Sequence, residues 1–111
     1  MNVTHALPEQ VAATPRPPSW TFLTNHAHVL LTLAQDPELR IRDVAVKVGI
    51  TERAAQRILH DLVAAGYVAR QRQGRRNTYR LALDRPLRHP LESRHSVGEL
   101  IDLLCHSSQR P

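Results

Sequence analysis

The sequence predicts a mainly α-helical single domain that carries a small β-hairpin and ends in a separate C-terminal helix. The chain has 111 residues, which is enough for one small domain. Apolar residues recur at helical spacing in several stretches, whereas one stretch alternates on both sides of a glycine-containing turn. Hydrophobic residues make up 41% of the chain but aromatic residues only 4%. A core of Leu, Val, Ile and Ala favours helices over a β-sandwich.

The composition excludes several classes of protein. Cys105 is the single cysteine, which excludes a disulfide framework and fits a reducing compartment, so we expect a cytoplasmic protein. The chain starts without the pattern of a secretory signal, and the uncharged stretch 17–35 is too polar to span a bilayer. A catalytic serine motif, a phosphate-binding glycine loop and paired carboxylates are all missing from the sequence. We therefore expect neither an enzyme nor a bound cofactor or metal.

Four segments are expected along the chain. Residues 1–18 contain four of the eight prolines and no apolar period, which predicts a flexible N-terminal arm. Residues 19–84 hold the main domain, and residues 85–95, with two further prolines, form an extended connector. Residues 96–106 are predicted to form a C-terminal helix, because this segment begins with the Ser-x-x-Glu spacing of a capping box.

The main domain is expected to begin with a helix over residues 25–35. Thr24 or Asn25 can cap its start, and Pro37 ends it. Its apolar residues cover a wide arc, so we expect this helix to be covered on a second side. The alternating residues 40–42 are the candidate for a short strand.

Two further helices follow across a tight turn. Asp43 is placed to cap the first of them, over residues 44–48, which ends at Gly49. Thr51 is placed to cap the next, which runs over about residues 51–65.

A β-hairpin is expected after Gly66, the left-handed residue that ends the third helix. Its strands are residues 67–73 and 78–83, on either side of a turn at 74–77. One face of the second strand is expected to close the core with Tyr79, Leu81 and Leu83.

The positive charge is concentrated in one part of the chain. Lys and Arg number 15 and Asp and Glu 10, which gives a net charge of +5. Residues 51–80 hold seven arginines and two acidic residues, whereas acidic and basic residues balance elsewhere. Solvated surfaces usually mix the two signs. Concentrated positive charge indicates a polyanionic partner, most commonly nucleic acid.

Residues 43–62 have the spacing of two helices that cross steeply. Ala45 is small where the second helix approaches the first, and Gly49 tolerates the positive φ of the turn. Ala55 and Ile58 are spaced to bury one side of the second helix against the first. This is the helix-turn-helix pattern.

Together with the hairpin, the chain resembles the winged helix-turn-helix of the MarR-like and ArsR-like bacterial transcription regulators. The resemblance covers residues 24–83 and rests on residues 42–51, 61–68 and 74–80. It implies sequence-specific binding of double-stranded DNA, with the helix at about 51–65 in the major groove and the wing at about 67–83 on the backbone or in the minor groove. The long dimerising helices of MarR-like proteins are missing or much shortened, so their ligand pocket is not carried over. The paired metal ligands of ArsR-like proteins are not found either.

The resemblance assigns base contacts to the N-terminal half of the recognition helix, at Glu52, Arg53 and Gln56. Arg53 matches the O6/N7 edge of guanine, and Gln56 matches the N6/N7 edge of adenine. Phosphate contacts are expected from the helix start, its exposed face and the first wing strand, namely Thr51, Arg57, His60, Arg70 and Arg72. The wing tip adds Arg75, Arg76 and Asn77.

A homodimer is expected because the C-terminal helix, about ten residues long, is too short to persist alone. It must pack on its own domain or on another subunit. We hypothesise a two-fold dimer through the first and last helices, with recognition helices in major grooves about 34 Å apart. The residues assigned to this interface are Val29, Leu33, Leu100, Ile101, Leu103 and Leu104. The sequence does not identify a small-molecule effector.

Two other functions stay open at this stage. A winged-helix domain can bind a protein partner in place of DNA, and the salt dependence of binding separates these two functions. A metal- or redox-responsive repressor would use His95, Cys105 or His106 between subunits, and tests with chelator, zinc and Cys105→Ser address it.

Overall fold

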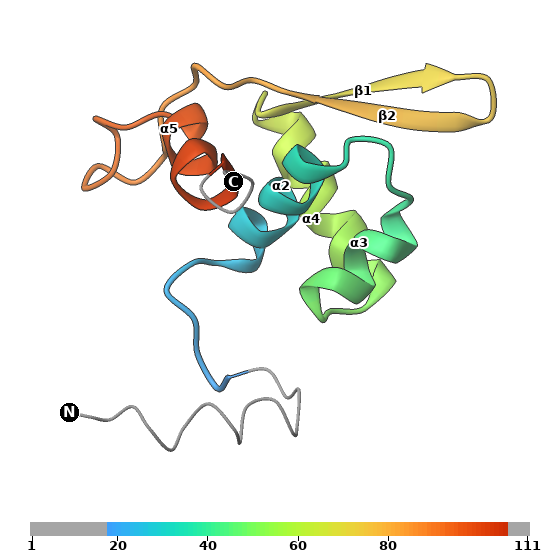
Figure 1. The fold of residues 1–111 in the computed structure, drawn as a ribbon, viewed down its shortest axis with the longest axis horizontal. Coiled ribbons are helices and arrows are strands. Elements are labelled where there is room, and N and C mark those ends of the chain that lie inside the picture. Colours follow the sequence, from blue (N-terminus) through green and yellow to red (C-terminus); the bar gives the residue numbers. More distant parts are fainter. Residues whose placement is uncertain (1–17, 107–111) are drawn as a thin grey trace.

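The computed structural model describes residues 18–106, so the predicted arm at 1–18 lies outside the described residues except for Pro18, as do residues 107–111. None of the helices between residues 18 and 106 has the length and apolar composition needed to cross a membrane. Figure 1 shows a group of helices from which a hairpin projects. In chain order, the elements are α2 (Asn25–Gln35), α3 (Ile41–Val48), α4 (Glu52–Ala64), β1 (Val68–Gln73), β2 (Arg76–Leu81), α5 (Val97–Ile101) and the π-helix η1 (Asp102–His106).

Helix α2 is the centre of the core. Helices α3 and α4 pack against it, and η1 packs on it from the side of α5 (Figure 1). Val29 and Leu33 of α2 are completely buried, together with Val44 of α3. The wide apolar arc of α2 is thus covered on a second side, as predicted, and the cover comes from the C-terminal segment of the same chain.

The predicted helix ends are largely confirmed. Helix α2 has the expected bounds, and the Thr24 hydroxyl caps it by accepting a hydrogen bond from the backbone N–H of Ala27 at 3.2 Å. The Thr51 hydroxyl caps α4 in the same way, by accepting from the N–H of Ala54 at 3.0 Å. Gly49 ends α3 with φ of 88°, in the left-handed region that favours glycine.

Two predictions between α2 and α3 are wrong. Residues 40–42 do not form a strand, because α3 already begins at Ile41. Asp43 is not the cap but lies in the first turn, where its negative charge favours the helix N-terminus. In place of a strand, the carbonyl of Pro37 accepts one hydrogen bond from the N–H of Tyr79 at 3.1 Å. This backbone bond attaches the edge of β2 to the α2–α3 loop.

Strands β1 and β2 form an antiparallel hairpin close to the predicted one. Arg70 pairs with Tyr79, and Arg72 pairs with Asn77. Gly74 turns the chain with φ of 64°. The hairpin extends well beyond the helices that support its base (Figure 1), so side chains near its tip are exposed on both faces.

The residues expected to close the core from this hairpin do so only in part. Tyr79 is buried and Leu81 is half-buried. Leu83 is 52% exposed, because β2 ends at Leu81 and the alternation of faces does not continue beyond the strand.

The C-terminal helix starts at the predicted capping box. The hydroxyl of Ser96 accepts from the N–H of Glu99 at 3.2 Å, and the carboxylate of Glu99 accepts from the N–H of Ser96 at 2.7 Å. The second bond, with the backbone of Ser96, holds the pKa of Glu99 below its usual range.

The end of this helix departs from the predicted α-helical period. An α-helical stripe through Val97 and Ile101 would continue to Leu104, but Leu104 is 41% exposed. The chain is π-helical from Asp102, with more residues per turn, so Cys105 is buried in its place. Gln35 Nε2 donates to Cys105 Sγ at 3.8 Å, which joins the end of α2 to η1.

Candidate nucleic-acid interface

Helix α4 is divided into one buried and one exposed face, as its sequence period predicts. Ala55, Ile58, Leu59 and Leu62 are buried against the core. All residues predicted to contact DNA from this helix are exposed, namely Glu52, Arg53, Gln56, Arg57 and His60. At 100° per residue they occupy one continuous arc opposite the buried side chains. The exposed arc is therefore available to a partner as a single surface.

The start of α4 is fixed by a short turn after α3. The N–H groups of Gly49 and Ile50 both donate to the carbonyl of Ala45, at 2.8 and 3.0 Å. Ala45 itself is buried, as expected for the small residue where the two helices cross. Thr51, an exposed residue, then caps α4. The first N–H groups of α4 and its positive dipole end lie beside the exposed arc, where they favour an anion.

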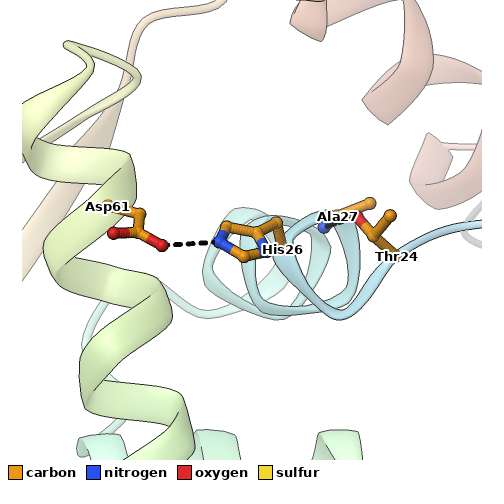
Figure 2. Close-up of polar contacts among 4 residues, drawn as sticks. All are labelled: Thr24, His26, Ala27 and Asp61. Atoms are coloured by element: carbon orange, nitrogen blue, oxygen red, sulfur yellow. Dashed lines mark hydrogen bonds and ion pairs between the residues drawn. The ribbon is translucent and has the colours of Figure 1, made fainter.

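A contact between α2 and α4 fixes the direction of one carboxylate on α4. His26 Nε2 and Asp61 Oδ2 form a hydrogen bond of 2.9 Å, shown by the dashed line in Figure 2. This bond, with smaller effects from His60 and Arg57, holds the pKa of Asp61 below its usual range. The carboxylate of Asp61 is thus directed toward α2.

The wing carries arginines on both of its faces. The register puts Arg70 and Arg72 on the same face as the buried Tyr79, whereas Arg76 and Arg80 lie on the opposite face. All four side chains are exposed. The predicted contact residues of the wing therefore do not form one flat surface.

The arginines at the wing tip differ in their contacts. Arg76 Nη2 donates to the carbonyl of Glu38 in the α2–α3 loop at 3.1 Å, and Arg72 Nε donates to the carbonyl of Gly74 at 3.1 Å. Arg75, in the turn itself, has no side-chain hydrogen bond within residues 18–106. Asn77 is half-buried opposite Arg72. Arg76 thus anchors the wing to the helices, and Arg75 is the tip arginine open to a partner.

The residues assigned to a dimer interface fall into two groups. Val29 and Leu33 are completely buried in the core of the single chain, and Ile101 is 7% exposed. These three assignments are corrected, because their side chains already pack within one chain. Leu103 is 69% exposed, Leu104 is 41% exposed and Leu100 is half-buried, so these three are accessible to a second subunit.

Sequence reasoning did not find two residues that hold α4 in place. His26 contacts Asp61 of α4, which lies 35 positions later in the chain. Arg85 contacts Ala65 at the end of α4, which lies 20 positions earlier. Neither contact has a periodicity or motif in the sequence, because each depends on where the chain returns in space.

The family-model comparison agrees with this arrangement of elements. A family model described as the MarR family matches residues 21–76, which is just over half of the chain. Of the two families that the sequence resembles, this is the one matched. None of the curated proteins matches the chain.

Among solved structures, the chain is similar to a MarR family protein, Rv2887 of Mycobacterium tuberculosis, in complex with salicylic acid. The alignment has 33% sequence identity and a TM-score of 0.46, and it covers 54% of this chain and 47% of that chain. The match thus spans about half the length of that protein.

The order of helices, the helix-turn-helix, the following hairpin and the family match agree with one another. The chain belongs to the MarR family and has its winged helix-turn-helix fold.

Proposed function

We propose that this protein is a cytoplasmic transcription regulator that binds double-stranded DNA sequence-specifically. Helix α4 enters the major groove, and the wing contacts the backbone or the adjacent minor groove. The observation that carries the proposal is the exposed arc of α4, which presents arginine, glutamine and histidine side chains from a helix whose other face is fixed in the core. MarR family membership supports the same function.

Within this proposal, each residue of the exposed arc has a defined role. Glu52, Arg53 and Gln56 contact base edges, with Arg53 on guanine and Gln56 on adenine. The residues that contact phosphates are Thr51, Arg57, His60, Arg70 and Arg72, joined by Arg75 at the wing tip. Arg76 and Asn77 act beside them, Arg76 from the position in which it also anchors the wing.

The proposal includes a two-fold homodimer. Leu103 and Leu104 are exposed apolar residues on η1, and Phe22 is 92% exposed just before α2. Contiguous exposed apolar patches commonly mark protein–protein interfaces, and Leu103 and Leu104 are neighbours in the chain. Sedimentation should give a dimer at micromolar concentration, and Leu103→Asp with Leu104→Asp should give a monomer. A wild-type protein that stays monomeric with and without DNA would remove the dimer from the proposal.

The proposed function is tested by selecting duplexes from a random pool with the full chain. We expect enrichment of a two-fold symmetric site. The logarithm of the affinity should fall with the logarithm of the salt concentration, with a slope of about −0.9 for each phosphate neutralised. Absence of any enriched sequence, together with binding that does not depend on salt, would refute the proposal and favour a protein partner.

Gln56→Ala tests the assignment of base contacts. On the selected site it should relax the preference at one base pair by about 1–3 kcal/mol, because the bidentate contact with adenine is lost. Binding to random duplex should not change. An equal loss on both duplexes would show that Gln56 has no part in specificity.

The metal- or redox-responsive alternative is tested on the same DNA. The Sγ atom of Cys105 is buried against α2, which does not favour a ligand shared between subunits. DNA affinity that is the same after chelation, after addition of zinc and in Cys105→Ser would remove this alternative.

A further inference from the structure

The C-terminal end of the recognition helix is held by an arginine from the connector. Arg85 Nη2 donates a hydrogen bond of 2.7 Å to the carbonyl of Ala65, the C-cap residue that follows α4. The last carbonyls of a helix have no partner within the helix, and a positive charge is favourable at that end of the helix dipole. The guanidinium carbon also lies 5.2 Å from the centre of the Tyr67 ring, in a cation–π contact.

Gly66 makes room for this contact. A Cβ atom on Gly66 would lie 3.0 Å from Nη2 and 3.3 Å from Cζ of Arg85. Gly66 also has φ of 85°, a conformation that residues with a side chain rarely adopt. The backbone between α4 and β1 is therefore shaped so that the guanidinium can lie directly against it.

The backbone of the same arginine is bonded to the wing and to the C-terminal helix. The N–H of Arg85 donates to the carbonyl of Ala82, just after β2, at 3.3 Å. The carbonyl of Arg85 accepts from the N–H of Val97, the first residue of α5, at 2.9 Å. Tyr67 adds two bonds, because its hydroxyl donates to the carbonyl of Pro86 at 2.6 Å and its own carbonyl accepts from the N–H of Ala82 at 2.9 Å. One residue thus contacts the end of α4, the base of the wing and the start of α5.

We infer that Arg85 is a positioning residue that fixes the recognition helix relative to the wing and the C-terminal helix. This inference rests on the proposed function, in which α4 and the wing contact one duplex together. A helix of 13 residues is about 20 Å long. Arg85 is therefore far from the bases that the N-terminal half of α4 contacts, and it acts on specificity through the orientation of α4.

The first test measures hydrogen exchange in the full chain without DNA. Arg85→Ala should speed exchange at the bonded N–H groups of Tyr67, Ala82 and Val97. Arg88→Ala is the matched control, because it removes the same charge three residues away, where the described residues offer Arg88 no hydrogen bond or ion pair. Equal exchange in the two variants at these three positions would overturn the inference.

The second test compares binding to the selected site with binding to random duplex. Arg85→Ala should weaken binding to the selected site by about tenfold, and its binding to random duplex should match that of Arg88→Ala. Arg85→Lys keeps the charge but not the planar group over Tyr67, so it should lose part of the specificity and no random binding. If Arg85→Ala does not fold, both measurements are made with Arg85→Lys.

The outcomes separate this inference from the proposed function. An equal loss on both duplexes would show a phosphate contact and overturn the positioning role. Unchanged binding to both would show a role in stability only, which also overturns it. If the wild-type chain prefers no duplex, the proposed function fails, and the exchange measurement still decides whether Arg85 holds the three elements together.

Discussion

The two arginines at the wing tip should differ when each is replaced by alanine. Arg75 has no side-chain hydrogen bond within the described residues, whereas Arg76 donates to the carbonyl of Glu38 in the α2–α3 loop. Under the proposed function, Arg75 contributes one charge to a phosphate. Arg76 contributes its charge and also holds the wing in position.

The size of the effect follows from counterion release. Each phosphate neutralised contributes about 0.9 to the salt slope, so loss of one contact at 0.15 M salt weakens binding about fivefold, or about 1 kcal/mol. Arg75→Ala should lose this amount on every sequence and keep wild-type stability. Arg76→Ala should lose more, because a hydrogen bond of about 1 kcal/mol that holds the wing is lost as well.

The assay is a fluorescence anisotropy titration of each variant at several salt concentrations. The duplexes are the selected site and a random sequence of the same length. Arg75→Ala should reduce the magnitude of the slope by about 0.9 on both duplexes. A slope equal to that of the wild type would show that the wing tip does not reach a phosphate. Equal losses for Arg75→Ala and Arg76→Ala would show that the bond to Glu38 does not contribute.

Three further predictions concern stability. Thr51→Ala removes the cap of α4 and should lower the free energy of unfolding in urea by about 1 kcal/mol and also weaken DNA binding. Thr24→Ala removes the cap of α2 and should cost as much stability but leave DNA affinity unchanged. Equal DNA affinities of the two variants would contradict the phosphate contact of Thr51. Leu33→Ala should cost about 2–5 kcal/mol of unfolding free energy, because the side chain is completely buried. A cost below about 1 kcal/mol would show that Leu33 does not lie in a packed core. The lowered pKa of Asp61, caused first by its bond with His26, means that this contact stabilises the fold fully at neutral pH and less as the pH falls through that pKa. Asp61→Asn should therefore be less stable than the wild type at neutral pH, and the difference should close in acid; a difference independent of pH would exclude the contact as its cause.

Local sequence determined most of the secondary structure. Thr24 and Thr51 cap helices because a hydroxyl at that position satisfies an N–H that the helix leaves without a partner. Gly49 ends α3 because its φ is costly for other residues. The exposed arc of α4 also followed from period alone, since a helix buried on one side exposes the other.

Two of the errors arose where residues distant in sequence meet. The alternation at residues 40–42 indicated a strand, but α3 begins at Ile41. The N–H of Tyr79 in β2 donates to the carbonyl of Pro37 instead of to a strand at 40–42. The apolar face of α2 indicated a second subunit, but η1 of the same chain covers it.

The sequence by itself determined the helix-turn-helix, the wing and the concentration of arginine between residues 51 and 80, because these depend on spacing along a few turns of chain. Only the tertiary structure decided which of those arginines are open to a partner and which hold the fold together. Arg75 and Arg76 are neighbours of the same chemical type, yet of the two it is Arg76 that donates to the carbonyl of Glu38 in the α2–α3 loop. Arg85 likewise acquires its role from the end of a helix 20 residues away. A hydrogen bond requires two groups within about 3 Å of each other, and for groups this far apart in sequence the folded path of the chain sets that distance.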